Sequence, residues 1–386
     1  MPMDSIELLA VPPLSDLKQR TSAKWRDFPQ DVLPLPVAEM DYEVALPIRE
    51  RLIAMVSSSD IGYLGSMPEL AHSMQTFMKK RWDWEITTES IFPATDVGVG
   101  MIELTRLLVH PGDGIVVNPP VYHNMFHWIQ ELKCVSIEAP LKRDGMLYSL
   151  DFDAIEKAYQ TGAKVHFLCN PANPVGTVFT REELSQLAEL AKKYGVTILS
   201  DEIHAPLTYS DQEFLPFLAV SDTAREVGIC VTSASKSWNL AGLKCAQIVT
   251  ASSRGFDLAK SMPAAVHWRS SLFGAAAATV AYQATDWLDS AIATNNHRRR
   301  FLKELLESAL PAIGYRIPDC SYLAWLDLTD LNLGADPSGR LLTEAKVAFS
   351  NGVTFAADHQ QFVRLNFATS EEILVEAVSR IATLTS

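Results

Sequence analysis

The stretch TSASKSWNLAGLK, residues 232–244, decides the fold of this chain. It surrounds Lys236 with serine and threonine hydroxyls, continues through an aromatic residue and a small Ala-Gly turn, and ends on Lys244. Most of the stretch is too polar for a core strand and too short for a separate surface helix. Alone it could be a serine-rich loop with two surface lysines, so its meaning depends on what the rest of the sequence supplies.

Length and charge narrow the possible classes of protein. The chain has 386 residues, of which 48% are apolar, so we expect a large core and two domains. With 33 basic and 46 acidic residues, the net charge is −13. An acidic balance argues against nucleic acid and against an anionic membrane surface as partners.

Cysteine usage and the N-terminus predict a cytoplasmic location. The five cysteines are odd in number and none are spaced as C-x-x-C, so we expect neither a disulfide framework nor a zinc or other metal site. The first 20 residues have no basic start and no long apolar run, unlike a secretory signal. No stretch reaches the roughly 20 apolar residues that span a bilayer. We therefore expect a soluble, cytoplasmic protein.

Helical and strand patterns alternate after an irregular segment at residues 1–45. Helices are predicted at 47–57, 68–81, 100–109, 180–195, 287–309 and 370–384, and strands at GIVVNPP, AKVHFLCN, VTILSDE and GICVTSAS. The helix at 180–195 carries Thr180 as N-cap, Glu183 at the capping-box position and Gly195 at its end.

The strand runs predict an α/β fold with a mostly parallel sheet covered by helices. The runs are apolar without strict alternation and are separated by helices, which is typical of a parallel sheet buried on both faces. Beyond Pro318 the pattern changes to a smaller α+β unit. We predict a large α/β domain over residues 46–286, and a small domain formed by residues 1–45 with residues 287–386.

Candidate chemistry gathers where the strands end. In open α/β sheets, ligands bind at the carboxyl ends of the strands. Those ends read FPATDVGVG, NPPVYH, CNPANPVG, SDEIHAPL and the stretch around Lys236. A pyridoxal-phosphate enzyme needs a lysine, a carboxylate for the pyridine nitrogen, a donor to the 3-oxygen, a stacking ring and phosphate ligands. Each has a candidate here, so pyridoxal 5'-phosphate is the predicted cofactor.

Lys236 is the candidate for the Schiff base with the cofactor. Ser233 and Ser235 can donate to phosphate oxygens, and Lys244 can supply a positive charge. A nearby cation also disfavours the protonated form of the Lys236 amine, which makes it a better nucleophile. The alternative for Lys236 is an ordinary surface lysine.

Asp201 and His204 follow one strand. A buried carboxylate at a strand end is costly unless it is paired, and a pyridinium nitrogen is a suitable partner. The alternative for Asp201 is a helix N-cap. His204 could face the 3-oxygen or stack near the ring, and it could equally be a satisfied core histidine. The neighbouring Glu202 is predicted to be structural.

Other cofactor contacts are predicted at three further strand ends. Asn173 lies in NPANPVG, where two Asn-Pro turns would point its amide inward as a donor to the 3-oxygen. Tyr122 is the candidate for stacking on the ring, or otherwise an interface tyrosine. The N–H groups of Gly98 and Val99 begin a helix and could bind the phosphate, although the glycine pattern alone is weak.

At this point the residues resemble a known family. The set NPANPVG, SDEIHAPL and SASKSWNLAGLK resembles the fold type I pyridoxal-phosphate enzymes of the aspartate aminotransferase superfamily. The closer resemblance is to its cystathionine β-lyase branch, the C–S lyases of the MalY/PatB family, which is marked by DEIH and SKxxNLAGL. KWRDFPQDVLPLPVAEMDYEVALPI, IGYLG and PPVYH match as well, and the resemblance covers about residues 20–370.

The resemblance implies roles for two more residues and a reaction. Tyr63 would reach the cofactor phosphate of a neighbouring subunit, which implies a homodimer. Arg364, in QFVRLNFA, would bind the α-carboxylate of the substrate, for which an arginine fork is well suited. The implied catalytic residues are Lys236, Asp201 and Tyr122. The implied activity is β-elimination of L-cystathionine or a related cysteine S-conjugate to pyruvate, ammonia and a thiol.

Some residues depart from the pattern of the branch, and two other functions stay open. Pro36, Glu39, Lys244 and Trp238 stand where the branch usually has other residues, so we expect an altered substrate pocket with the same cofactor. An aminotransferase on the same scaffold would share the first chemical steps. A regulatory, protein-binding member of the branch is the remaining alternative, although no extra domain or basic patch supports it.

Overall fold

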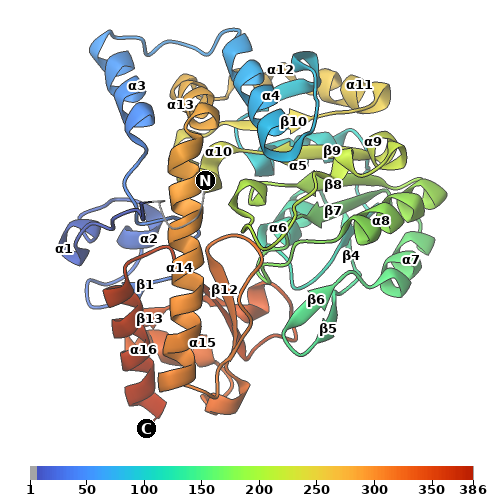
Figure 1. Cartoon of the computed structure of the whole chain (residues 1–386). Coiled ribbons are helices and arrows are strands. Elements are labelled where there is room, and N and C mark those ends of the chain that lie inside the picture. The colour runs from blue at the N-terminus through green and yellow to red at the C-terminus, as the bar shows by residue number, and fades with distance from the viewer. Residues whose placement is uncertain (1–6, 386) are drawn as a thin grey trace.

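The computed structural model of the chain describes residues 7–385. Figure 1 shows a large sheet with its helices in one part of the molecule and smaller sheets in the other, with the long helix α14 (Thr285–Ala309) running between the two parts. Residues 1–6 and 386, which belong to the predicted small domain, lie outside the described residues. None of the helices in the described range is long and apolar enough to cross a membrane.

The large sheet has seven strands in the order β2-β10-β9-β8-β7-β3-β4. Their bounds are Ile91–Ala94 (β2), Gly114–Val117 (β3), Val135–Glu138 (β4), Val165–Cys169 (β7), Thr197–Asp201 (β8), Gly228–Thr232 (β9) and Ala246–Val249 (β10). β10 is antiparallel to both of its neighbours, whereas β9, β8, β7, β3 and β4 pair in parallel. The predicted fold class, with a mostly parallel sheet, is confirmed.

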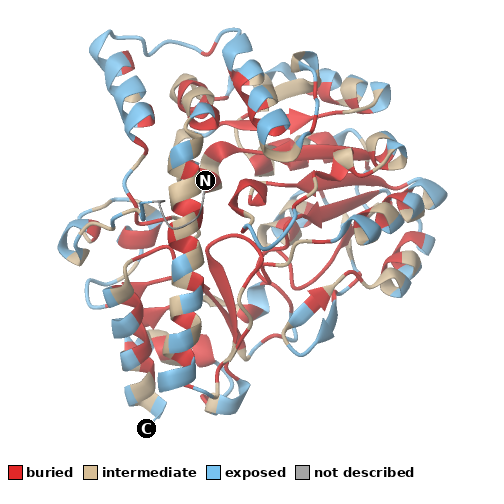
Figure 2. Cartoon of the chain, in the orientation of Figure 1, coloured by how far each residue is buried: buried red, intermediate tan, exposed pale blue. Residues whose placement is uncertain are grey.

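Helices cover both faces of this sheet, which explains the unbroken apolar runs. Phe167 and Leu168 are adjacent on β7 and belong to different core clusters, because successive side chains point to opposite faces. One face packs on α5, α6, α11 and α12, and the other on α7, α8, α9 and α13. Figure 2 shows the inner strands of this sheet, such as β7, β8 and β9, as buried. The helices are Val97–Arg106 (α5), Asn124–Glu131 (α6), Phe152–Gln160 (α7), Arg181–Tyr194 (α8), Asp222–Val227 (α9), Ser253–Ser261 (α11), Ala264–Trp268 (α12) and Leu272–Gln283 (α13).

Helix α8 has the caps predicted for it, whereas α5 begins earlier than predicted. At α8, the capping box between Thr180 and Glu183 forms and Gly195 adopts a left-handed conformation, as predicted. The helix predicted at 100–109 begins three residues earlier, as α5, because the Asp96 side chain accepts a hydrogen bond from the Val99 N–H and caps it. The sequence reading gave Asp96 no role.

The smaller sheets bring the two ends of the chain together. A four-stranded sheet has the order β11-β12-β15-β14, and β1 pairs in parallel with β13. Residues 1–45 therefore contribute a strand, and α1 and α2 as well, so the prediction of an irregular segment was wrong there. The proposed domain boundaries themselves stay a prediction. The elements are Leu14–Leu17 (α1), Ala23–Arg26 (α2), Leu33–Pro34 (β1), Gly314–Tyr315 (β11), Leu323–Asp327 (β12), Pro337–Arg340 (α15), Val347–Ala348 (β13), Ser350–Asn351 (β14), Phe362–Asn366 (β15) and Glu371–Thr385 (α16).

The remaining elements lie at the edges or in connections. They are Leu46–Ser57 (α3), Pro68–Trp82 (α4), Lys142–Asp144 (β5), Leu147–Ser149 (β6) and Ala234–Ser237 (α10), with short turns of 3-10 helix such as Ala205–Leu207. No element was predicted from the sequence at β10 or α11–α13; β10 has only four residues, and α13 is rich in alanine.

Candidate active site

A cavity of about 520 Å³ lies at the carboxyl ends of the large sheet, next to the smaller four-stranded sheet. This volume suits a cofactor with a small substrate. Its walls include Asp201 at the end of β8, Lys236 in α10 after β9, and Arg364 from β15. Residues far apart in the sequence are thus brought together, as the strand-end argument predicts.

A larger hollow, of about 1250 Å³, lies between the end of α4 and α14. Three of its cations, Lys79, Arg81 and Arg300, are already in ion pairs with nearby carboxylates. Its walls carry none of the predicted cofactor residues. The smaller cavity is therefore the candidate site.

The Lys236 side chain enters the cavity from the short helix α10. Its Nζ donates a hydrogen bond to the carbonyl of Ala38 at 2.9 Å, and the side chain is half-buried. Burial and, next to it, the charge of Arg364 lower the pKa of Lys236 to about 8. The amine is thus much closer to its neutral, nucleophilic form than a surface lysine would be.

Asp201 is a buried carboxylate at the end of β8. Its Oδ1 accepts a hydrogen bond from the Ile203 N–H at 3.1 Å, and it forms no ion pair within residues 7–385. Burial raises the pKa of Asp201 to about 6. The carboxylate closes a tight turn rather than capping a helix, so the alternative of a helix N-cap was wrong. A protonated ring nitrogen would supply the missing partner.

Asn173 and Arg364 face the cavity as a hydrogen-bonded pair. Arg364 Nη1 donates to Asn173 Oδ1 at 2.9 Å, which leaves the Asn173 NH₂ group as a donor. Arg364 is only 4% exposed, so the alternative of a surface arginine was wrong. It has no carboxylate partner in the described chain, and its Nε has no hydrogen bond. An unpaired buried guanidinium is costly, so an anionic ligand is the natural complement.

Tyr122 and His204 also line the cavity. The Tyr122 ring is half-buried, and its hydroxyl accepts a hydrogen bond from Asn124 at 2.6 Å. His204 is buried, with Nδ1 3.0 Å from the Ser321 hydroxyl, and burial lowers its pKa to about 3. His204 is therefore neutral, and it combines the two alternatives: a satisfied core histidine that also faces the ligand space.

The predicted phosphate end needs two corrections. The Val99 N–H is not free, because it donates to Asp96 Oδ1 at 2.9 Å. The Ser233 hydroxyl donates to the Cys245 carbonyl at 2.5 Å and so cannot also donate its hydrogen to a phosphate. The Ser235 hydroxyl is engaged as well, because it lies 2.8 Å from Ser233 Oγ and is the donor of that pair. Of the predicted phosphate ligands, Gly98 and Lys244 line the cavity and still have an N–H group to donate.

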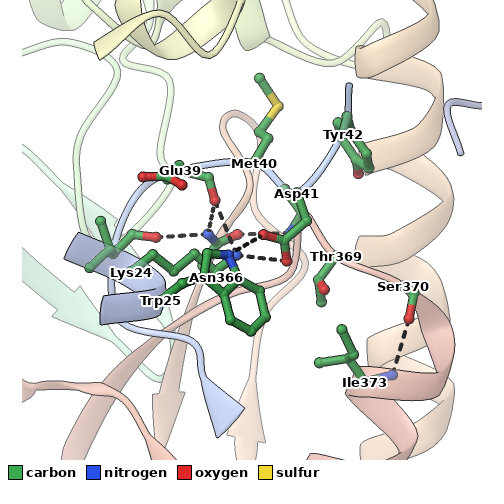
Figure 3. Close-up of polar contacts among 12 residues, drawn as sticks. Lys24, Trp25, Glu39, Met40, Asp41, Tyr42, Asn366, Thr369, Ser370 and Ile373 are labelled. Carbon is green, nitrogen blue, oxygen red and sulfur yellow. Dashed lines mark hydrogen bonds and ion pairs between the residues drawn. The ribbon is translucent and has the colours of Figure 1, made fainter. Parts of the chain in front are cut away.

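The carbonyl groups of Pro36 and Ala38 accept hydrogen bonds from Arg364 and Lys236 in the cavity. The segment that carries them is held in place by a buried polar cluster, shown in Figure 3. Lys24 Nζ lies 2.8 Å from Asp41 Oδ2, and both side chains are essentially unexposed. Asn366 donates to the carbonyls of Val37 and Glu39, at 2.7 and 2.6 Å. Removing one member of such a buried pair costs about 3–5 kcal/mol. This cluster fixes the backbone that Lys236 and Arg364 contact.

Only some departures from the family pattern reach the cavity. Pro36 and Lys244 line it. Trp238 is fully buried in the core, and the Glu39 carboxylate accepts a hydrogen bond from the Ser22 hydroxyl at 2.6 Å, outside the cavity wall. Pro36 and Lys244 therefore lie where they can alter the substrate pocket directly, whereas Trp238 and Glu39 are absent from the cavity wall.

The residues of the cavity wall that sequence reasoning missed include Asp96, His123 and Ser350. His123 follows Tyr122 in a segment that had been singled out, and Asp96 lies within FPATDVGVG, so both had a signal. Ser350 had none, because it reaches the site only through the pairing of β14 with β15, opposite Arg364.

The residues present fit pyridoxal phosphate. Asp201 forms no ion pair within residues 7–385, the Asn173 amide has hydrogens to donate, and Lys236 offers an amine of lowered pKa. In this order, the three residues would suit the ring nitrogen, the 3-oxygen and the aldehyde of the cofactor. Arg364 remains for a substrate carboxylate.

Comparison with known proteins agrees with this geometry. Residues 31–381 match the aminotransferase class I and II family. The chain is 35% identical to a cystathionine β-lyase of Corynebacterium glutamicum, over 97% of this chain and 99% of that protein. It is 30% identical to the cystathionine β-lyase PatB of Bacillus subtilis, over 91% and 92% of the two chains. The crystal structure of cystalysin from Treponema denticola, which contains pyridoxal 5'-phosphate, superposes with a TM-score of 0.90 at 25% identity, over 98% of each chain.

Proposed function

We infer that this chain, which belongs to the aminotransferase class I and II family, is a pyridoxal-phosphate-dependent carbon–sulfur β-lyase. Its substrate is L-cystathionine or a related cysteine S-conjugate. The observation that carries the proposal is one cavity that joins Lys236, Asp201, Asn173 and Arg364, in a chain similar along nearly its whole length to a cystathionine β-lyase.

Each end of the cofactor has matching residues. Asp201 would accept a hydrogen bond from the ring nitrogen, Asn173 would donate to the 3-oxygen, and the Tyr122 ring would stack on the pyridine. Lys236 would hold the cofactor covalently. When bound, pyridoxal phosphate supplies an electron sink that allows the Cα–H bond of an amino acid to break.

The chain itself binds the substrate and moves protons. Arg364 binds the α-carboxylate, which fixes Cα near Lys236. The substrate amino group would take the place of Lys236 on the cofactor, and the Lys236 amine released in this exchange, with its pKa lowered to about 8, takes the Cα proton. The Cβ–S bond then breaks, and the sulfur leaves with the bonding electrons and gains a proton. Overall, L-cystathionine and water give homocysteine, pyruvate and ammonia.

A product assay tests this function. The purified enzyme with pyridoxal phosphate and L-cystathionine should form pyruvate, ammonia and homocysteine in equal amounts. L-Alanine is the control substrate, because it carries no leaving group on Cβ and should yield no pyruvate without a keto acid. Absence of pyruvate from both L-cystathionine and S-alkyl cysteines would refute the proposal.

Arg364→Lys should lower kcat/KM for L-cystathionine by about 10–100-fold. The lysine keeps the charge and loses the two-pronged contact with the carboxylate, and a hydrogen bond to a charged group contributes about 1.5–3 kcal/mol. Steady-state kinetics measures the effect, with Arg340→Lys, whose partly exposed side chain pairs with Glu344 away from the cavity, as the matched control. An unchanged kcat/KM in Arg364→Lys would remove Arg364 from substrate binding.

We propose that the active unit is a homodimer in which Tyr63 reaches the partner's cofactor phosphate. Helix α3 carries exposed Leu46, Ile53 and Val56, at 53%, 58% and 62% exposure, and Ile61 follows at 64%. Figure 2 shows the outer side of α3 as exposed. An apolar surface of this kind usually marks an interface. Tyr63 is 94% exposed and is absent from the cavity wall of its own chain.

Tyr63→Phe should weaken pyridoxal-phosphate binding about tenfold or more and leave the dimer intact, because one hydrogen bond to a charged phosphate is lost. Equilibrium dialysis gives the affinity and analytical ultracentrifugation the mass. Tyr194→Phe, which removes a hydroxyl bound to Glu156 on the surface, is the control. A fully active monomer would contradict the shared site.

We also propose that the enzyme works in the cytoplasm. All five cysteines are free thiols, four of them buried, which suits a reducing compartment. The predicted absence of nucleic acid as a partner rests on the net charge of −13.

A further inference from the structure

Asp96 places a carboxylate at the end of the cavity where the cofactor phosphate would bind. It follows β2, lines the cavity together with Gly98 and Lys244, and is partly buried. Its Oδ1 accepts the hydrogen bond from the Val99 N–H at 2.9 Å, and its Oδ2 lies 3.1 Å from Lys244 Nζ. One acidic side chain thus occupies two groups that an anionic ligand would use.

The ion pair changes the charge available to a phosphate. Lys244 is the basic residue that the sequence places at this end, and Asp96 is its one ion-pair partner within residues 7–385. Together the two side chains carry no net charge. The Ser233 hydroxyl is also engaged, by the Cys245 carbonyl. The Ser235 hydroxyl lies 2.8 Å from Ser233 Oγ and donates its hydrogen there, so what remains for the phosphate from this chain is backbone N–H groups at the start of α5.

We propose that Asp96 lowers the affinity of the site for the cofactor phosphate, so that bound cofactor exchanges more readily with free cofactor in solution. This inference rests on the proposed cofactor. A carboxylate next to a bound phosphate repels it, and it competes with the phosphate for Lys244. Water and salt screen the charges of Asp96 and Lys244, which keeps the change in cofactor affinity at about tenfold. The same side chain caps α5, which is a structural benefit of an acid at this position.

Asp96→Asn isolates the charge from the cap. Asparagine is as good an N-cap as aspartate, so α5 should keep its start. In titrations of the apoprotein followed by tryptophan fluorescence, with Trp128 in the cavity wall, Asp96→Asn should bind pyridoxal phosphate about tenfold more tightly than the wild type. Inorganic phosphate should compete about tenfold better. Pyridoxal, which lacks the phosphate, should bind both proteins equally.

A second variant and a double mutant sharpen the test. Asp96→Ser keeps a capping hydroxyl and should show the same tightening, which guards against a fault specific to asparagine. Lys244→Gln should weaken pyridoxal-phosphate binding more in the Asp96→Asn background than in the wild type, because Lys244 is then free to serve the phosphate. Equal or weaker binding of pyridoxal phosphate by both Asp96 variants would overturn the inference. A wild-type protein that does not bind pyridoxal phosphate would instead overturn the proposed cofactor.

Discussion

Lys236→Ala is expected to abolish covalent retention of pyridoxal phosphate and to lower lyase activity by at least about 10⁴-fold. The variant loses both the amine that binds the cofactor covalently and the base that takes the Cα proton. After borohydride reduction, mass spectrometry of the wild type should find the cofactor on the peptide that contains Lys236. The variant should carry none.

The control is Lys142→Ala, on the exposed strand β5. It should retain the covalent link and full activity. The wild-type apoprotein should also capture the cofactor faster as the pH rises through about 8, because the pKa of Lys236 is lowered to about 8 and the neutral amine is the reactive form. Covalent cofactor in reduced Lys236→Ala would assign the chemistry to another lysine.

Asp201→Ala is expected to lower kcat by about a thousandfold or more. The carboxylate holds a proton on the ring nitrogen, and without it the cofactor is a weaker electron sink. A thousandfold loss corresponds to about 4 kcal/mol of transition-state stabilisation, at 1.36 kcal/mol per decade. The pKa of Asp201 is about 6, so this carboxyl is mostly ionised at neutral pH and able to play that role.

Asp201→Asn separates the charge from the packing of this buried position. It keeps the shape of the side chain and removes the charge, so its kcat should fall to a similar level while the protein stays folded. Glu202→Gln is a matched neighbour: Glu202 accepts hydrogen bonds from Ser200 and the Phe217 N–H, and it lies outside the cavity wall. That variant should keep most of its kcat if it folds. Near-normal turnover in Asp201→Asn would remove Asp201 from the mechanism.

Elements with local signals were predicted well from the sequence. Helix α8 could be placed because its cap, its capping box and its terminal glycine lie within its own residues. The start of α5 was missed although its cap, Asp96, is local, because Gly98 and Gly100 lower the helix propensity of the first turn. β1 was missed because a two-residue strand exists only through its pairing with β13 near the other end of the chain.

The site shows the same division between local and distant information. Lys236, Asp201 and Asn173 follow strands of one sheet, and topology alone brings such strand ends together. The hydrogen bonds of Arg364 to Asn173 and to the Pro36 carbonyl join residues 191 and 328 positions apart. Hydroxyl and N–H groups that seemed free, in Ser233 and Val99, were engaged by neighbours that only the folded chain reveals.

The most direct measurement of the central claim is the number of turnovers without a keto acid. The enzyme loaded with pyridoxal phosphate is mixed with excess L-cystathionine, and pyruvate and the absorbance of the cofactor are followed together. The account predicts continuous release of pyruvate, far beyond one molecule per site, with no accumulation of the pyridoxamine form. Product that stops near one equivalent per site, accumulation of the pyridoxamine form, and recovery only on addition of a keto acid would contradict the lyase and establish an aminotransferase.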